Sequence, residues 1–272
     1  MLLKRVLTVA ILLPLFLAAL FLLPNLYWGI LLVGVIAIAG WEWGGLAGYA
    51  TRGRALFVAV VLASAVLILV WEHGAAKTSL VYTPFGKALY ALTAAFWIGI
   101  VPVWLYYRRQ VRDPLLLGVI GWIVLVPCWY AMVWLQVPPM RLFLTLGVIW
   151  IADTAAYFVG RQFGRRKLAP QISPGKTWAG VWGAIGAVIV YGIVVWAVAP
   201  AGSVRLASGL VLVLLMTLLS IVGDLFESWM KRVAGVKDSG ELLPGHGGLL
   251  DRVDGLTATL PLAVLYLAYR LS

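Results

Sequence analysis

The chain has 272 residues, of which 63% are hydrophobic and only 11% are charged. A soluble domain is about 45–50% apolar and about 25% charged, so this composition excludes an ordinary water-soluble protein. The net charge of +11 does not indicate nucleic-acid binding, because the basic residues lie in short gaps between apolar runs, as in membrane proteins. We expect an all-α polytopic integral membrane protein with one transmembrane domain over residues 1–272, and no nucleic-acid partner.

Nine apolar runs are each long enough to cross the hydrocarbon core as a helix of about 20 residues. The first follows Lys4 and Arg5, as in a signal peptide, but it is longer than the usual apolar core of about 7–15 residues, so we expect a retained helix. The nine predicted spans are 6–24, 27–48, 55–73, 88–107, 115–135, 141–160, 178–199, 206–227 and 255–271.

The distribution of basic residues predicts the orientation. If the N-terminus is cytoplasmic, 16 of the 21 Lys and Arg residues fall in cytoplasmic segments, as the positive-inside rule requires. The polar loops 161–177 and 228–254 then lie on the cytoplasmic side. We expect the helices over about 6–135 to form a scaffold, and residues 141–271 with these two loops to carry catalysis.

Six of the ten acidic residues lie within the 31 residues from Asp224 to Asp254. Carboxylates this close repel each other unless a cation joins them, so the cluster is a candidate metal site at the membrane boundary. Asp224, Glu227, Ser228 and Lys231 share one helix face by their spacing. The alternative is a salt bridge at the helix end, from Asp224 or Glu227 to Lys231.

The start of the ninth run carries Asp251, Arg252 and Asp254. The aspartates are candidates for metal binding, or alternatively for capping the helix, since acids favour its first turn. Arg252 is a candidate for holding a phosphate.

A glycine-rich turn precedes them at residues 244–248. Its glycines allow backbone N–H groups to approach an anion, although such a turn alone is weak evidence. His246 is a candidate for phosphate contact, for stabilising the turn or, less favoured, for acting as a general base.

A second polar patch follows the sixth run, near whose end Asp153 lies. Residues 161–167 hold four cations, which a positive-inside anchor explains in part. We expect Pro174 and Gly175 to form a turn that presents Lys176 and Thr177 at the start of the seventh helix, where a phosphate would be favoured.

Three other ionisable residues are expected outside the site. Glu42, near the end of the second run, is expected to pair with an arginine. Glu72 and His73 are expected to lie at the outer membrane interface without a catalytic role.

The segment from Ser228 to Asp254 resembles the full motif of the phosphatidate cytidylyltransferases, also called CDP-diacylglycerol synthases. It reads Ser-Trp-Met-Lys-Arg at 228–232, Lys-Asp-Ser-Gly at 237–240 and Leu-Pro-Gly-His-Gly-Gly-Leu-Leu-Asp-Arg-Val-Asp at 243–254. Segments 173–178 and 223–228 and the layout of apolar runs over the whole chain are also similar to that family. One departure is Ala155, where the family more often has glycine.

The resemblance implies that CTP and phosphatidic acid react to give CDP-diacylglycerol and diphosphate. It also implies dependence on Mg²⁺ with room for a second cation such as K⁺, a nine-helix fold, a homodimer and a place in the bacterial inner membrane. Two rivals remain: a transporter, and a transferase that joins a CDP-alcohol to another head group.

From these patterns we expect three sets of site residues. The catalytic candidates are Asp153, Asp224, Lys237, His246, Asp251 and Asp254. The substrate-binding candidates are Ser173, Lys176, Thr177, Ser228, Lys231, Arg232, Gly245, Gly247, Gly248 and Arg252. The metal candidates are Asp224 and Asp251.

Overall fold

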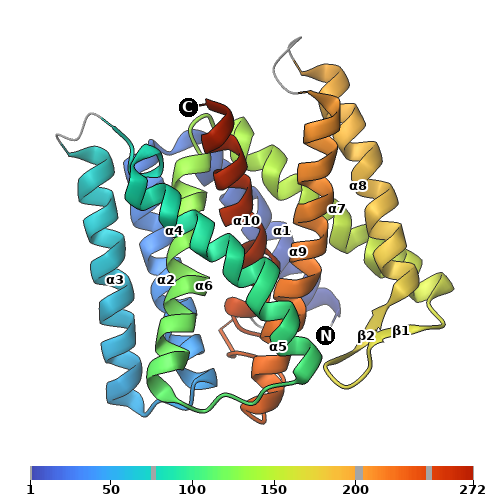
Figure 1. Ribbon diagram of the computed structural model, residues 1–272, viewed down its shortest axis with the longest axis horizontal. Coiled ribbons are helices and arrows are strands. Elements are labelled where there is room, and N and C mark those ends of the chain that lie inside the picture. The colour runs from blue at the N-terminus through green and yellow to red at the C-terminus, as the bar shows by residue number, and fades with distance from the viewer. Residues whose placement is uncertain (1, 75–77, 200–204, 243–246, 272) are drawn as a thin grey trace.

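The computed structural model describes residues 2–74, 78–199, 205–242 and 247–271, and these residues are almost entirely helical. The helices lie side by side in one bundle, from which a small hairpin of two strands projects at one end (Figure 1). The elements are α1 (Leu2–Leu22), α2 (Asn25–Leu46), α3 (Thr51–His73), η1 (Leu80–Tyr82), α4 (Pro84–Ala95), η2 (Phe96–Ile100), α5 (Val101–Tyr107), α6 (Pro114–Leu135), α7 (Pro139–Phe163), β1 (Lys167–Ala169), β2 (Ser173–Thr177), α8 (Trp178–Val198), α9 (Leu206–Val233) and α10 (Leu250–Leu271).

Within the described residues, seven helical segments are long and apolar enough to cross a membrane. They are α2, α3, the continuous segment Pro84–Tyr107, α6, α7, α8 and α9. Helices α1 and α10 lie where the first and ninth spans are predicted, although they are not among the seven. The all-α membrane class is therefore confirmed, whereas the count of nine spans and the cytoplasmic N-terminus stay predictions.

Several helices begin at a proline, whose fixed φ suits the first helical turn. Pro84, Pro114 and Pro139 start α4, α6 and α7. Side-chain oxygens cap two of these starts: Gly86 N–H donates to Thr83 over 3.1 Å, and Leu116 N–H donates to Asp113 over 2.7 Å.

The C-terminal half of α9 is held by aromatic packing. Phe226 is 1% exposed, and its ring packs against the rings of Trp43, Phe96, Trp97 and Trp104. These partners come from α2, η2 and α5, so the apolar core fixes the helix that also carries Asp224 and Glu227.

The chain segments after α2, α5, α7 and α9 lie at the same end of the bundle (Figure 1). Trp229, near the end of α9, donates its indole N–H to the Arg109 carbonyl in the α5–α6 connection over 3.0 Å. The prediction that loops 161–177 and 228–254 share one side of the molecule is therefore confirmed, although which side faces the cytoplasm stays a prediction.

The two polar loops are shorter than predicted. Helix α9 continues to Val233, so residues 228–233 are helical, and α7 continues to Phe163. The predicted turn at Pro174 and Gly175 is wrong: both lie in β2, and the turn falls at residues 170–172. Antiparallel pairing of β1 with β2 extends this segment, and a two-stranded sheet tolerates a proline because each strand has a free edge.

Candidate active site

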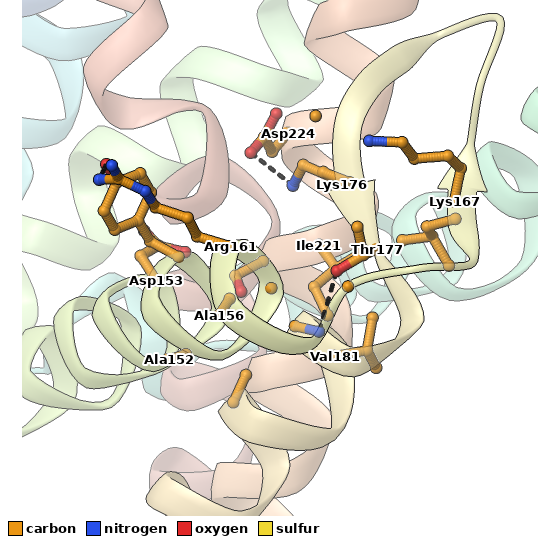
Figure 2. Close-up of a pocket in the computed structure, with 18 residues that line it drawn as sticks. Ala152, Asp153, Ala156, Arg161, Lys167, Lys176, Thr177, Val181, Ile221 and Asp224 are labelled. Atoms are coloured by element: carbon orange, nitrogen blue, oxygen red, sulfur yellow. Dashed lines mark hydrogen bonds and ion pairs between the residues drawn. The ribbon is translucent and has the colours of Figure 1, made fainter.

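A cavity of about 580 Å³ opens between α7, α8, α9 and the β1–β2 hairpin (Figure 2). Three cationic side chains line it, Arg161 from α7, Lys167 from β1 and Lys176 from β2. Asp153 and Asp224 are the acids among its lining residues. The cavity thus brings together charges of both signs from four elements.

Lys176 and Asp224 form an ion pair across this cavity, with 2.5 Å between Nζ and Oδ2 (Figure 2). Their side chains are 23% and 36% exposed, so both remain accessible to a ligand. The pair joins β2 to α9. Strand β2 ends at Thr177, and α8 begins at the next residue. Thr177 makes that junction: its hydroxyl oxygen accepts from Gly180 N–H over 3.2 Å and caps α8.

Helices α7 and α8 approach closely beside the cavity because of glycine. A Cβ added at Gly180 would lie 2.8 Å from the Ala156 carbonyl oxygen, and one at Gly183 would lie 2.6 Å from Val159. Larger residues here would push α8 away from α7 and widen the cavity.

Asp224 is close enough to two other acids for their charges to repel, Asp153 on α7 and Asp254 on α10. The charge of Lys176 attracts all three carboxylates. Gly223 permits this gathering, since a Cβ there would lie 2.6 Å from the Asp254 carbonyl oxygen. We call Asp153, Lys176 and Asp224, which line the cavity, the open cluster; Asp254 lies between it and Lys231, because its charge also interacts with Glu227 and Lys231.

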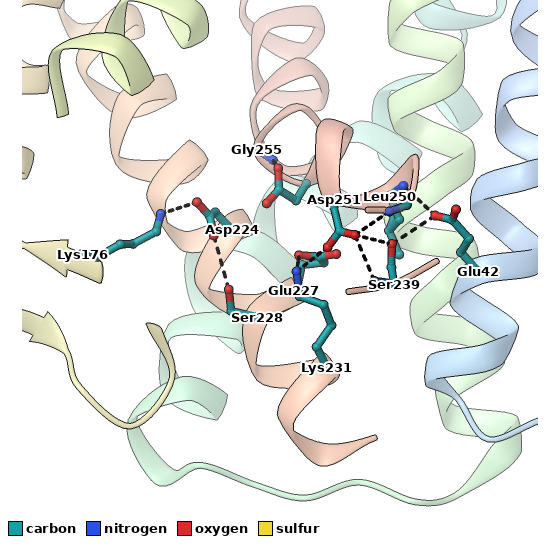
Figure 3. A network of polar contacts seen from close by, with 12 residues as sticks. Glu42, Lys176, Asp224, Glu227, Ser228, Lys231, Ser239, Leu250, Asp251 and Gly255 are labelled. Atoms are coloured by element: carbon teal, nitrogen blue, oxygen red, sulfur yellow. Dashed lines mark hydrogen bonds and ion pairs between the residues drawn. The ribbon is translucent and has the colours of Figure 1, made fainter. Parts of the chain in front are cut away.

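A second cluster surrounds Lys231 on α9 (Figure 3). Its ammonium bonds Glu227 over 2.6 Å and also bonds Asp251. The other oxygen of Asp251 accepts from Ser239 N–H at 2.9 Å, the Ser239 hydroxyl at 3.0 Å and Gly248 N–H at 2.8 Å. All three charged side chains are no more than 13% exposed. We call Glu227, Lys231, Ser239 and Asp251 the closed cluster.

The alternative readings of the acidic segment are both partly realised. The helix-end salt bridge exists between Glu227 and Lys231, whereas Asp224 pairs with Lys176. Asp251 lies in the first turn of α10, and its carboxylate reaches back to accept the N–H of Gly248, as an acid in the first turn of a helix can. Ser228 lies one turn after Asp224, with its hydroxyl 3.4 Å from Oδ1 of that carboxylate.

The remaining candidates lie around these clusters. Ser173 is half-buried in β2, and Arg232, Lys237 and Arg252 are exposed. Gly245 and His246 fall outside the described residues.

The described part of the glycine-rich turn, Gly247 and Gly248, packs against Asp251. Gly248 donates its N–H to that carboxylate, so this group is already used within the protein. Gly247 has φ +79°, a left-handed conformation that favours glycine, and a Cβ there would lie 2.7 Å from Asp251 Oδ2. Contact of this turn with a triphosphate stays a prediction.

The two predicted metal ligands, Asp224 and Asp251, are each paired with a different lysine, and their joint role as metal ligands stays a prediction. Asp224 belongs to the open cluster and Asp251 to the closed one. Among the described residues, no three side chains of His, Cys, Asp or Glu gather in a group that could hold a metal ion.

Two of the charged residues that line the cavity were missing from the predicted site, Arg161 and Lys167. The signal for Arg161 is helical spacing, because Asp153, Tyr157 and Arg161 follow one another at intervals of four on α7. Arg161 donates to the Tyr157 hydroxyl over 3.2 Å. No comparable signal marks Lys167, whose position depends on the hairpin.

The prediction for Glu42 is wrong. Its partners within the described residues are the backbone N–H groups of Leu249 and Leu250 and the hydroxyl of Ser239, and no arginine is among them. The sequence conceals this role because about 200 residues separate Glu42 from its partners.

Comparison with known proteins indicates the family to which the chain belongs. The model of the cytidylyltransferase family matches residues 3–270. The chain is 38% identical to the phosphatidate cytidylyltransferase of Pseudomonas aeruginosa over 277 aligned residues, which cover 96% of this chain and 95% of the relative. The enzyme of the same name from Haemophilus influenzae is 35% identical and covers 96% of both chains. That of Bacillus subtilis is 44% identical over 123 residues, 44% of this chain and 45% of the relative.

Cations and carboxylates converge on one cavity of a protein whose described helices are long and apolar enough to cross a membrane, and the names of the nearly full-length relatives make it an enzyme, a transferase. The family match covers nearly the whole chain and the relatives are transferases. The chain belongs to the cytidylyltransferase family.

Proposed function

We propose that this enzyme transfers a cytidylyl group from CTP to phosphatidic acid, giving CDP-diacylglycerol and diphosphate. The observation that carries the proposal is the cavity in which Arg161, Lys167 and Lys176 converge beside Asp224. Both substrates are phosphate esters, and convergent cations are what holds two such anions together. The names of the two nearly full-length relatives support the same reaction.

The reaction mainly requires that the two substrates be positioned correctly. A phosphate oxygen of phosphatidic acid attacks the α-phosphorus of CTP, the bond from that phosphorus to the bridging oxygen of the β-phosphate breaks, and diphosphate leaves with the electron pair. The attacking phosphate is already ionised near neutral pH, since its second pKa is about 6. A strong general base is therefore unnecessary, and holding two anions together and stabilising the leaving group is the main task.

We assign the phosphate-holding role first to Lys176, Arg161 and Lys167, which line the cavity. Arg232 near the end of α9, Lys237 in the segment that joins α9 to α10, and Arg252 in the first turn of α10 are exposed, and there they would meet CTP as it arrives. Lys231 is already bonded to Glu227 and Asp251, so we assign it mainly to holding these two carboxylates in place.

We propose dependence on Mg²⁺, with a second cation such as K⁺ in the same site. The donor chemistry fits at Asp224, an accessible carboxylate on which a metal would replace Lys176, because Mg²⁺ is usually held by one or two carboxylates together with substrate phosphates. A bound Mg²⁺ would neutralise negative charge on the substrate phosphates. Asp251 would become a ligand only after exchanging Lys231, because its oxygens are otherwise occupied.

We further propose a homodimer in the bacterial inner membrane, with the N-terminus and the site facing the cytoplasm. The charge distribution supports the orientation, since a chain that crosses the membrane nine times places 16 of its 21 basic residues on the side of the polar loops. The lipid would enter sideways between helices, and CTP would enter from the water phase.

One assay tests the reaction and separates it from its rivals. Purified protein receives labelled CTP, phosphatidic acid and Mg²⁺, and release of diphosphate is measured. We expect release that requires the lipid and that accompanies formation of CDP-diacylglycerol. A transporter would release none, and a CDP-alcohol transferase would consume CDP-diacylglycerol; either result would count heavily against the proposal.

A further inference from the structure

Glu42 connects a distant helix to the segment that carries Asp251. It lies on α2, is 6% exposed, and uses both carboxylate oxygens. Oε1 accepts from Leu249 N–H at 3.0 Å, and Oε2 accepts from Leu250 N–H at 2.8 Å. Oε2 also lies 3.1 Å from the Ser239 hydroxyl (Figure 3).

These contacts hold the start of α10. The first N–H groups of a helix have no partner within the helix, and a negative charge beside them is favourable. A residue next to the helix in sequence usually supplies this cap, whereas here Glu42 supplies it from α2. The position of α10, and so of Asp251 in its first turn, is thereby tied to the N-terminal half of the chain.

Ser239 links Glu42 to Asp251 directly. Its hydroxyl oxygen lies 3.1 Å from Glu42 Oε2 and 3.0 Å from Asp251 Oδ2. A hydroxyl has one proton, so it donates to one carboxylate at a time while its backbone N–H stays on Asp251. Moving the Glu42 carboxylate would therefore move Ser239 and change its hydrogen bonds to Asp251. Because Asp251 is paired with Lys231, the position of Lys231 would change as well.

Two glycines leave space for the Glu42 carboxylate. A Cβ at Gly240 would lie 2.5 Å from Glu42 Oε1, and one at Gly248 would lie 2.6 Å from Oε2. Real Cβ atoms do not approach oxygen so closely, and the crowded atoms are a buried carboxylate that is bonded on both oxygens. Glycine at these two positions therefore lets the Glu42 carboxylate on α2 reach the segment before α10.

From these contacts we propose that Glu42 is a positioning residue of the transferase site, which acts on Asp251 through Ser239 and the start of α10. The proposal deepens the proposed function and rests on it. Glu42 does not touch substrate in this account; it fixes the place of a residue in the site.

The test compares Glu42→Gln with a matched control, Glu72→Gln. Glu72 accepts hydrogen bonds from Leu80 N–H at 2.7 Å, the Ser79 hydroxyl at 3.1 Å and the Tyr130 hydroxyl at 2.5 Å. Like Glu42, it therefore binds the first N–H of a helical element, here the short helix η1, through its carboxylate. None of these partners belongs to either cluster, so Glu72→Gln should keep kcat within about twofold of wild type.

For Glu42→Gln we expect kcat to fall by about tenfold or more, since small misplacements in a site have effects of this size. The KM for CTP should change by less than about threefold, because the altered contact lies away from the cavity cations. Amide hydrogen exchange at Leu249 and Leu250 should accelerate in the same variant. The readouts are steady-state kinetics and exchange measured on the purified protein in detergent.

Ser239→Ala is the second variant, and it keeps the cap on α10 while removing the hydroxyl link. We expect a comparable loss of kcat, and a double variant scarcely worse than either single one, because both act through one path. If Glu42→Gln does not purify as folded protein, Ser239→Ala decides alone. Unchanged kcat in either folded variant, or equal losses in Glu42→Gln and Glu72→Gln, would overturn the positioning role.

The two proposals fail in different ways. A wild-type protein that shows no lipid-dependent release of diphosphate overturns the proposed reaction, and the positioning role falls with it. An active wild type with unaffected folded variants overturns the positioning role alone.

Discussion

Lys176 and Lys231 have the same chemistry and opposite surroundings. Lys176 lies at a cavity, with an accessible partner in Asp224 and two further acids nearby. Lys231 lies between Glu227 and Asp251, and all three side chains are nearly closed to solvent. The difference indicates a division of work, in which the open cluster meets substrate and the closed cluster holds the segment that follows α9.

The strongest test of this division is Asp224→Asn. We expect turnover to fall by about 10³-fold, because the variant removes a charge at the centre of three carboxylates and weakens the hold on Lys176, and site electrostatics commonly contribute this much. The thermal midpoint in detergent should stay within a few degrees of wild type, since Asp224 is accessible to solvent.

The control for Asp224→Asn is Asp113→Asn, at the same end of the bundle. Asp113 caps α6 and asparagine caps equally well, so neither activity nor stability should change. Near-normal turnover in Asp224→Asn would remove this residue from the site.

Asp251→Asn should reduce turnover by about 10²-fold or more and should also destabilise the protein. The variant leaves Lys231 with only Glu227 as a charged partner and disturbs three donors to Oδ2, and a hydrogen bond to a charged group is worth about 1.5–3 kcal/mol. Activity and thermal midpoint are measured together. A loss of activity with an unchanged thermal midpoint would show that Asp251 acts on substrate, as Asp224 is expected to, and does not hold the protein together.

Arg161→Gln should have a smaller and different effect, a rise of about tenfold in the KM for one substrate, because one bond between a cation and a phosphate is lost. Initial rates with CTP and with phosphatidic acid varied in turn identify which substrate the cavity cation holds. Arg52→Gln removes an equal charge from an exposed position that does not line the cavity, and it should leave both KM values unchanged. An equal rise in both variants would mean that net charge, not the cavity, is responsible.

The sequence predicted the parts of the site that depend on local spacing. Apolar runs located the helices, and helical intervals placed Glu227 with Lys231 on one face. It could not predict contacts between distant segments, because nothing local marks them: Lys176 meets Asp224 across the hairpin, and Glu42 meets Leu250 across 208 residues.

The acidic cluster shows the same limit more sharply. Proximity in sequence suggested one metal site with Asp224 and Asp251 as ligands. In the structure α9 and α10 direct these two carboxylates to different lysines, so the acids divide into two clusters with different exposure. Which lysine each carboxylate meets depends on the direction of the side chains on two packed helices. The spacing of residues along the sequence does not specify that direction.

The smallest expected effect distinguishes a structural from a substrate-binding role for Thr177. Its hydroxyl caps α8, so Thr177→Ala should cost about 1 kcal/mol of stability, a typical value for a lost N-cap, and should lower the thermal midpoint slightly. Turnover and the KM for CTP should stay within about threefold of wild type, and Thr177→Ser, which keeps the hydroxyl, should restore the midpoint. A large rise in the KM for CTP in Thr177→Ala would instead show that this hydroxyl binds substrate, because loss of a cap alone leaves the cavity cations in place.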